Sequence, residues 1–347
     1  MQSVDIQRIE NQTKQNGTKS YTKIVYDDNS PFKLSDGRRI GKLEIKNKDI
    51  GKLTVSFYKN NLNGTKCLSS TIELMISKGN NNLQNLSTKE YQARIGEVFR
   101  MLANTYGIVV DYATIKIKKI ELNATFYLTE PYEKYKQAIL LLIRNIPSKR
   151  YNNKYATWHE LSNKDKLETV FVKNSSIELK IYNKGKHLQD IGEIGHLEKD
   201  IMRVEYTIKD KRILDRTFGN NLVSSLSDIK INELFKKFFV RDIVSQYSLW
   251  SAENHKQLVE LTKRHKKQCI KWTGNFFREC RQYAEENGLP LLFDVDDMRS
   301  VFQELEQKGS RNASKKFRKF KNQAIYEADL VGNTTRCKEI IFKVLDM

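Results

Sequence analysis

Apolar and polar residues alternate along two segments near the middle of the chain, residues 176–182 and 201–208. A period of two directs successive side chains to opposite faces of a strand, so each segment is predicted to be a half-buried β-strand. A mixed-charge segment connects the two, and each strand is followed by cationic residues. Two adjacent strands with basic ends would form a phosphate-facing edge. A solvated hairpin with ordinary surface lysines explains the same pattern equally well.

Earlier alternating runs predict further strands, and helical periods separate them. Ser87 followed by Glu90 is the capping-box pattern, and the apolar spacing after it predicts a helix that ends before Gly107. Strands interrupted by helices, without strict βαβ alternation, favour an α+β fold in which an antiparallel sheet carries helices on one face. The remaining predicted strands are residues 42–45, 52–58, 71–76 and 114–128, and the second predicted helix is 132–146.

Beyond about residue 227 the pattern becomes helical throughout. The predicted helices are residues 231–247, 255–271, 276–287 and 294–308, and a further one that starts near residue 313. We therefore expect an all-helical C-terminal part after the α+β body. The predicted division is a weakly ordered lead-in at 1–35, an α+β domain at 36–227, and a helical, basic, DNA-binding domain at 228–347.

Charge narrows the class of partner. The chain of 347 residues carries 61 Lys and Arg against 42 Asp and Glu, a net charge of +19, which attracts polyanions such as nucleic acid. No apolar run approaches the roughly 20 residues of a membrane span, so no membrane partner is expected. The four cysteines include no CxxC pair, which argues against a zinc site or a disulfide framework and predicts a reducing, cytoplasmic location.

Two clusters of basic residues lie in the helical part, the first at residues 263–271 and the second at residues 311–321. The second contains no acid and is interleaved with Phe317 and Phe320, which a helix would turn toward the core. Residues 296–307, a turn at Gly309 and the following basic helix have the outline of a helix-turn-helix, whose second helix would enter a groove. A solvated cationic face is the alternative, and either cluster could serve RNA. The predicted DNA contacts are Lys184, Lys211, Arg212, Lys263, Arg264, Lys266, Lys267, Lys271, Arg311, Lys315, Lys316, Arg318, Lys319 and Lys321.

The two alternating strands also resemble a known family. IELKIYNKGKHL, followed about 20 residues later by IMRVEYTIK, resembles the paired strands of replication initiators from small plasmids and filamentous phages, with the form I-Y-[DN]-K…R-[IV]-E. KIELNATFYL is similar to the earlier strand of those proteins, which carries an acidic metal ligand. The resemblance covers about residues 85–225. It implies a protein that binds origin DNA and, in rolling-circle members, nicks one strand through a tyrosine with Mg²⁺ or Mn²⁺.

Carried over residue by residue, the family's positions correspond to Glu121 on the earlier strand, to Tyr182 and Lys184 on the first paired strand, and to Arg203 and Glu205 on the second. The resemblance then implies that Glu121 and Glu205 are metal ligands and that Arg203 contacts DNA. The sequence leaves the nucleophile open among Tyr151, Tyr155, Tyr182 and Tyr206.

Three departures from the family pattern weaken strand cleavage more than origin binding. The chain has no His-x-His, Phe171 stands where related sequences often have a tyrosine, and Thr125 replaces a second acid. A second hypothesis is therefore a non-enzymatic origin or operator binder, acting as a theta-type initiator or a regulator that recruits host replication proteins. A mobilisation relaxase is the third. In each case the expected partner is double-stranded or single-stranded DNA.

Overall fold

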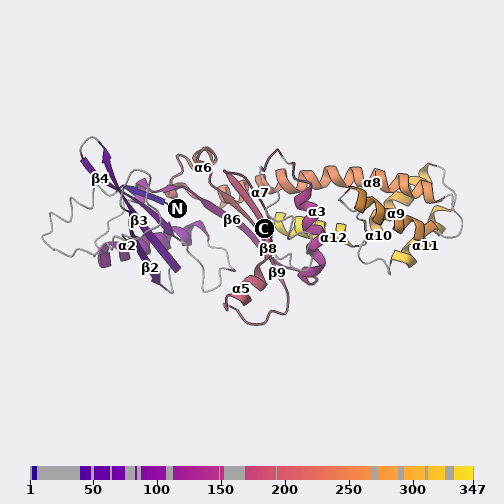
Figure 1. Ribbon diagram of the computed structural model, residues 1–347, viewed down its shortest axis with the longest axis horizontal. Helices are drawn as coiled ribbons and strands as arrows, with labels where there is room; N and C mark the ends of the chain where they lie inside the picture. Colours follow the sequence, from indigo (N-terminus) through magenta and orange to yellow (C-terminus); the bar gives the residue numbers. More distant parts are fainter. Residues whose placement is uncertain are drawn as a thin grey trace.

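The computed structural model describes residues 2–5, 40–47, 51–62, 65–74, 83, 87–106, 112–147, 149–151, 169–192, 194–266, 272–287, 293–308, 312–324 and 332–346. Within these residues, two antiparallel sheets precede a helical region (Figure 1). The predicted α+β class is therefore confirmed. No helix of the described part is apolar and long enough to traverse a bilayer.

The first sheet has five strands in the order β2-β3-β4-β1-β5. The three strands predicted before residue 80 are present and are longer than expected. The segment 2–5 forms β1 and pairs with β4 and β5, whereas a weakly ordered lead-in was predicted for it. The strands are β1 (Gln2–Asp5), β2 (Ile40–Asn47), β3 (Gly51–Leu62), β4 (Thr65–Leu74) and β5 (Lys116–Ile117).

Helix α2 (Thr88–Tyr106) begins and ends where the sequence predicts. The backbone N–H of Ser87 donates to Glu90 Oε2 at 3.0 Å, and the backbone N–H of Glu90 donates to Ser87 Oγ at 3.2 Å. This reciprocal pair satisfies two backbone donors at the helix start, which confirms the predicted capping box.

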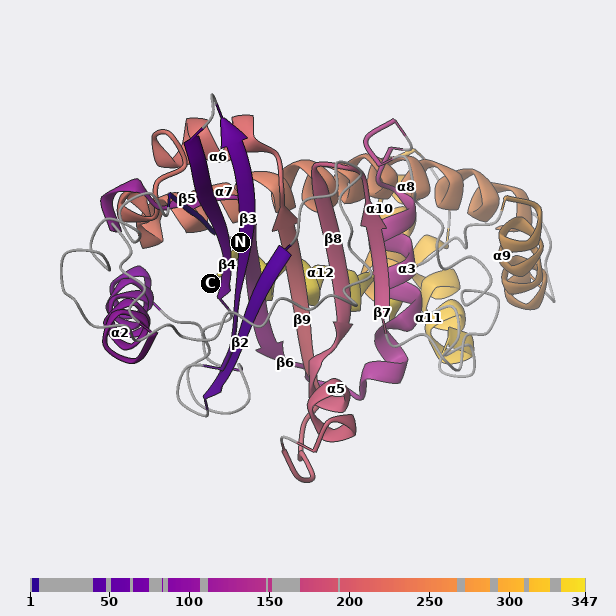
Figure 2. The same ribbon diagram turned by 60° about the vertical axis from the view of Figure 1, so that its left-hand side comes forward.

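The second sheet has four antiparallel strands in the order β6-β9-β8-β7 (Figure 2). Strands β8 (Ile177–Asn183) and β9 (Ile201–Ile208) are the two alternating segments, and they pair directly with one another. The long strand predicted at 114–128 is interrupted, so that its first part joins the other sheet as β5. The rest forms β6 (Ile120–Tyr127), and β7 is Thr169–Lys173.

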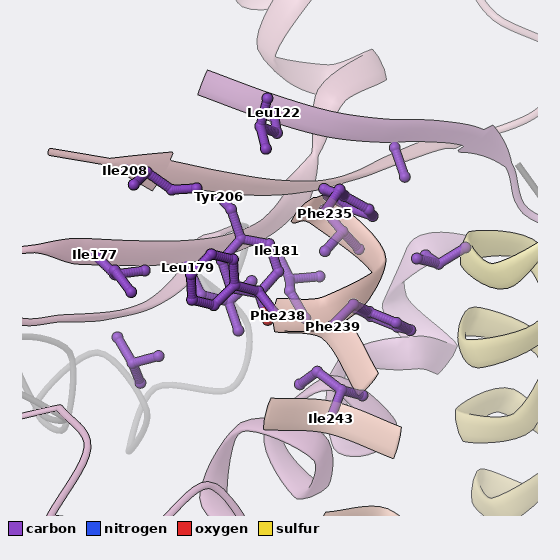
Figure 3. Close-up of a cluster of buried hydrophobic side chains, with 14 of the residues drawn as sticks. Leu122, Ile177, Leu179, Ile181, Tyr206, Ile208, Phe235, Phe238, Phe239 and Ile243 are labelled. Carbon is purple, nitrogen blue, oxygen red and sulfur yellow. The ribbon is translucent and has the colours of Figure 1, made fainter. Parts of the chain in front are cut away.

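Helices cover the apolar face of this second sheet. These are α3 (Lys136–Arg144), α7 (Asp228–Phe239) and α12 (Asn333–Leu345). In Figure 3, Leu179 and Tyr206 of the strands face Phe235, Phe238 and Phe239 of α7, and all five side chains are buried. Each such side chain contributes about 1.5–3 kcal/mol by leaving water. Because these helices cover the apolar face of the second sheet, the polar side chains of its strands lie on the opposite face.

A single long helical path leaves the sheet after α7. A π-helical turn, η5 (Val240–Val244), leads directly into α8 (Ser245–Lys266), which extends from the sheet toward the opposite end of the molecule (Figure 1). The sequence predicted two separate helices here, 231–247 and 255–271. The chain then folds into α9 (Trp272–Asn287), α10 (Val295–Gln307) and α11 (Ala313–Ala324).

The buried apolar residues form two clusters that meet along α8. Leu258 and Leu261 in the second half of α8 belong to the smaller cluster, together with α9, α10 and α11. Helix α12 returns to the main core through Cys337 and Ile340. The predicted boundary at residue 227 thus marks the point after which the described elements are all helices. The cores instead divide within α8, and α7 and α12 pack with the sheet.

Candidate functional site

Polar side chains from three strands gather on the face of the second sheet opposite its apolar core. Alternation places them there, because every second residue of β6, β8 and β9 points away from the covering helices. The strand register sets them in rows across the sheet. One row contains Asn123, Glu205 and Lys180, and the next contains Thr125, Arg203 and Tyr182.

Glu205 joins the two rows through both carboxylate oxygens. Lys180 Nζ donates to Oε1 at 3.4 Å, and the Tyr182 hydroxyl donates to Oε2 at 3.3 Å. The Glu205 side chain is 11% exposed, so both contacts are partly shielded from water. The structure therefore brings Tyr182 and Glu205, two of the predicted site residues, into direct contact.

Burial and a neighbouring charge set the acidity of Tyr182. Its half-buried position and the adjacent Glu205 carboxylate raise its pKa to about 12, although the Arg203 guanidinium acts in the opposite direction. The hydroxyl is therefore protonated at neutral pH, and it already donates to an acceptor that can take its proton. The edge of the His187 ring lies near Tyr182, with ring centroids 6.3 Å apart.

Arg203 is buried rather than displayed to a ligand. It is 2% exposed, and its Nε donates to Thr125 Oγ1 at 2.7 Å, while Thr125 Oγ1 donates to Asn123 Oδ1 at 3.1 Å. Thr125, which replaces the acid expected from the family pattern, thus accepts a hydrogen bond from a cation. The predicted direct DNA contact by Arg203 does not agree with this burial, and the chain of hydrogen bonds instead fixes the polar face.

Two of the four candidate nucleophiles lie in the core. Tyr206 points to the apolar face of β9, because its position in the strand has the opposite parity to Glu205. The hydroxyls of Tyr151 and Tyr206 both donate to Asp242 Oδ2, at 2.7 and 3.4 Å. Neither hydroxyl is accessible to DNA in this fold, so the structure gives both a packing role. Tyr155 lies outside the described residues.

The predicted metal pair does not converge in this arrangement. Glu121 opposes Thr207, and Glu205 opposes Asn123, so the two carboxylates are diagonal neighbours across adjacent strands. Glu121 is about half exposed and pairs with Lys119. Both oxygens of Glu205 already accept from Lys180 and Tyr182. Among the described residues, no three His, Cys, Asp or Glu side chains are grouped to hold a metal ion. The residues present therefore do not fit Mg²⁺ or Mn²⁺ as predicted.

The cations expected at the strand ends differ in accessibility. Lys184 is 5% exposed because β8 continues directly into helix α5 (Lys184–Asp190), which packs on β9; its predicted phosphate contact does not agree with this burial. Lys211 and Arg212 are exposed at the start of α6 (Lys211–Phe218). Each pairs with a nearby acid, Asp215 or Asp210.

The first predicted basic cluster is partly neutralised by acids. Lys263 pairs with Glu260 at 2.6 Å, and Arg264 pairs with Glu279 of α9. Lys266 belongs to α8. Lys267 and Lys271 lie outside the described residues.

The second predicted cluster lies on α11 with the predicted orientation. Phe320 is buried, and its ring centroid lies 5.4 Å from that of Phe277 and 6.4 Å from that of Phe302 of α10. The opposite side of α11 carries the cations. Lys315, Arg318, Lys319 and Lys321 are exposed, Lys316 is half-buried, and Arg311 lies outside the described residues.

Sequence reasoning missed three residues of these networks. Lys180 and Glu178 share strand parity with Tyr182, so the period-two rule already placed them on one face. Asp242 gives no comparable signal, because the tyrosines that contact it are distant in sequence.

No known protein family, curated protein or solved structure was found to match the chain.

Proposed function

We propose that this protein initiates replication by binding origin DNA, with the exposed basic side of α11 as a main contact surface. The observation that carries the proposal is the two-sided character of α11. Its aromatic residues anchor it to α9 and α10, while four cations remain exposed on its outer side. A helix fixed in this way can present cations to phosphates and side chains to base edges.

The polar face of the second sheet supports a second part of the proposal, cleavage of one strand through Tyr182. Glu205 takes the proton of the Tyr182 hydroxyl as the phenolic oxygen attacks phosphorus. The bond from phosphorus to the leaving sugar oxygen breaks, this oxygen takes a proton from solvent water, and a phosphotyrosine linkage forms. The Tyr182 hydroxyl already donates to Glu205 Oε2 at 3.3 Å, so the proton can pass to this carboxylate as the oxygen attacks.

The hydrogen bond between Tyr182 and Glu205 also favours a second candidate function, an origin or operator binder that does not cut DNA. In this alternative Tyr182 and Glu205 are a structural hydrogen-bonded pair, and their partial burial keeps the hydroxyl away from phosphate. The basic side of α11 serves both functions in the same way. Replication proteins of the host would then be recruited to the bound origin.

A covalent-adduct assay separates the two functions. Purified protein is incubated with supercoiled DNA carrying its own origin, in separate reactions with Mn²⁺ and with EDTA. Cleavage predicts open circles and a protein–DNA adduct that Tyr182→Phe abolishes without weakening DNA binding. Tyr127→Phe is the matched control, because Tyr127 is 56% exposed on the adjacent part of the sheet. Sequence-specific binding without an adduct in either reaction contradicts cleavage and supports the binder.

A further inference from the structure

Lys180 lies among the acidic side chains of the polar sheet face. Its Nζ is 3.4 Å from Glu205 Oε1 and 3.5 Å from Glu178 Oε1. The two carboxylates are only 11% and 17% exposed, whereas the Lys180 side chain is 32% exposed. Lys209 also contacts Glu178, at 3.9 Å. A single ammonium group therefore bridges two partly buried acids on adjacent strands.

The charge of this ammonium is secured by its surroundings. Carboxylate oxygens of Glu205 and Glu178 both lie within 3.5 Å of Lys180 Nζ, so its positive charge is paired with an acid of its own strand and with one of the neighbouring strand. Without Lys180, the carboxylates of Glu205 and Glu178 would leave an excess of negative charge at this place on the face. Lys180 thus neutralises carboxylates that an added cation would need.

The positions of the contacts also decide where a metal could bind. A Mg²⁺ ion on Glu205 would have to approach a carboxylate oxygen to about 2.0–2.1 Å. It would meet the Lys180 ammonium at Oε1 and the Tyr182 hydroxyl at Oε2.

We infer that Lys180 is the resident cation of this site and takes the place in which the family resemblance predicts a divalent metal. Lys180 is a positioning residue: it holds Glu205 beside the Tyr182 hydroxyl and supplies the adjacent positive charge. The inference concerns the composition of the site, so it does not depend on whether the protein cleaves DNA.

Titration with Mn²⁺, followed by calorimetry and by the electron paramagnetic resonance signal of free Mn²⁺, tests this inference on the full chain without DNA. Wild type and Lys180→Arg, which keeps the charge, are expected to show no saturable Mn²⁺ binding. Lys180→Met keeps the length of the side chain but frees Glu178 and Glu205, so it is expected to gain a saturable site. Adding Glu205→Gln to Lys180→Met should remove that site. Lys119→Met is the matched control, because Lys119 pairs with Glu121 nearby but does not contact Glu205.

Two results would overturn the inference. One is Mn²⁺ binding by wild type that Glu205→Gln abolishes, which would make Glu205 a metal ligand despite Lys180. The other is folded Lys180→Met, verified by circular dichroism, that binds no more Mn²⁺ than wild type. If Lys180→Met does not fold, the comparison of wild type with Glu205→Gln still decides, because absence of wild-type binding supports a resident cation and its presence contradicts one.

Discussion

At the scale of single residues, Asp242 joins the π-helical turn to the sheet. Its carboxylate is fully buried and accepts from Tyr151 at 2.7 Å, from both Nε and Nη2 of Arg241 at 2.7 Å, and from Arg150 at 3.1 Å. Burial, and then the adjacent Asp242 charge, raise the pKa of Tyr151 well above its usual range, so this hydroxyl remains a donor. A π-helical turn commonly marks a place where a helix is adjusted to a specific contact.

Asp242→Asn is expected to lower the free energy of unfolding by about 1.5–3 kcal/mol, because it weakens charge-assisted hydrogen bonds at a buried carboxylate, while its partners Arg150 and Arg241 are about a third exposed and stay solvated. Urea denaturation measures the change. Asp296→Asn is the control: Asp296 is 79% exposed and pairs with Arg299, so its loss should change stability by less than about 0.5 kcal/mol. Equal effects of the two substitutions would show that the Asp242 network does not stabilise the fold.

Residue parity shows what the sequence could and could not predict at this scale. Alternation in β8 and β9 predicted both strands, and the same rule separates Tyr182 from Tyr206, since they lie on opposite faces. The role of Asp242 could not be predicted, because its partners lie about 36 and 91 residues away along the chain.

At the scale of elements, α12 is fastened to the end of β6 by an ion pair. Arg336 Nε donates to Glu130 Oε2 at 2.7 Å, and Lys134 Nζ donates to Oε1 at 2.8 Å. The hydrogen bond from Arg336 and then that from Lys134 lower the pKa of Glu130 from 4.5 to about 2. Because the pKa is lower in the folded state, the pair stabilises the fold fully above about pH 4.5. That contribution is lost as the pH falls toward 2.

Glu130→Gln should therefore be less stable than wild type at neutral pH, and the difference should close between about pH 4.5 and pH 2. Urea unfolding of both proteins across this range measures the difference. In an Arg336→Gln background, Glu130→Gln should have a smaller effect, because the main partner is absent. Parallel stability curves through the acid range would contradict this account of how α12 is attached.

The break predicted between two helices, at residues 248–254, is absent from the structure. Two separate helices were predicted at 231–247 and 255–271. The residues between them contain neither Gly nor Pro, although Ser251 and Asn254 are weak helix formers. The structure continues α8 through them, and Asn254 is buried. Tertiary packing along a helix that contributes to both cores outweighs local propensity. By contrast, Ser87 and Glu90 fixed the start of α2 by a local hydrogen-bond pattern, which the sequence alone was able to predict.

At the scale of the whole molecule, α8 connects the sheet body to the unit of α9, α10 and α11 (Figure 1). Contacts from α10 to α12 add a second connection, because Lys338 Nζ donates to Asp297 Oδ1 at 3.1 Å. The exposed cations of α11 and the polar sheet face therefore belong to parts joined through two helices. The proposed function requires the α11 cations to contact DNA phosphates.

The salt dependence of DNA binding shows whether the α11 cations contact phosphates. Affinity for DNA carrying the protein's own origin is measured over a series of salt concentrations for wild type and for the combined variant Lys315→Gln, Arg318→Gln and Lys319→Gln. The control variant replaces the exposed Lys230, Lys237 and Lys256 of α7 and α8 with Gln, so that both variants lose equal charge.

Each phosphate contact contributes about 0.9 to the slope of log affinity against log salt. If α11 contacts DNA phosphates, the slope should be less steep by about 2 to 3 for the α11 variant and nearly unchanged for the control. Equal slopes for wild type and the α11 variant, or binding that does not weaken with salt, would contradict the assignment of α11 as the DNA-binding surface.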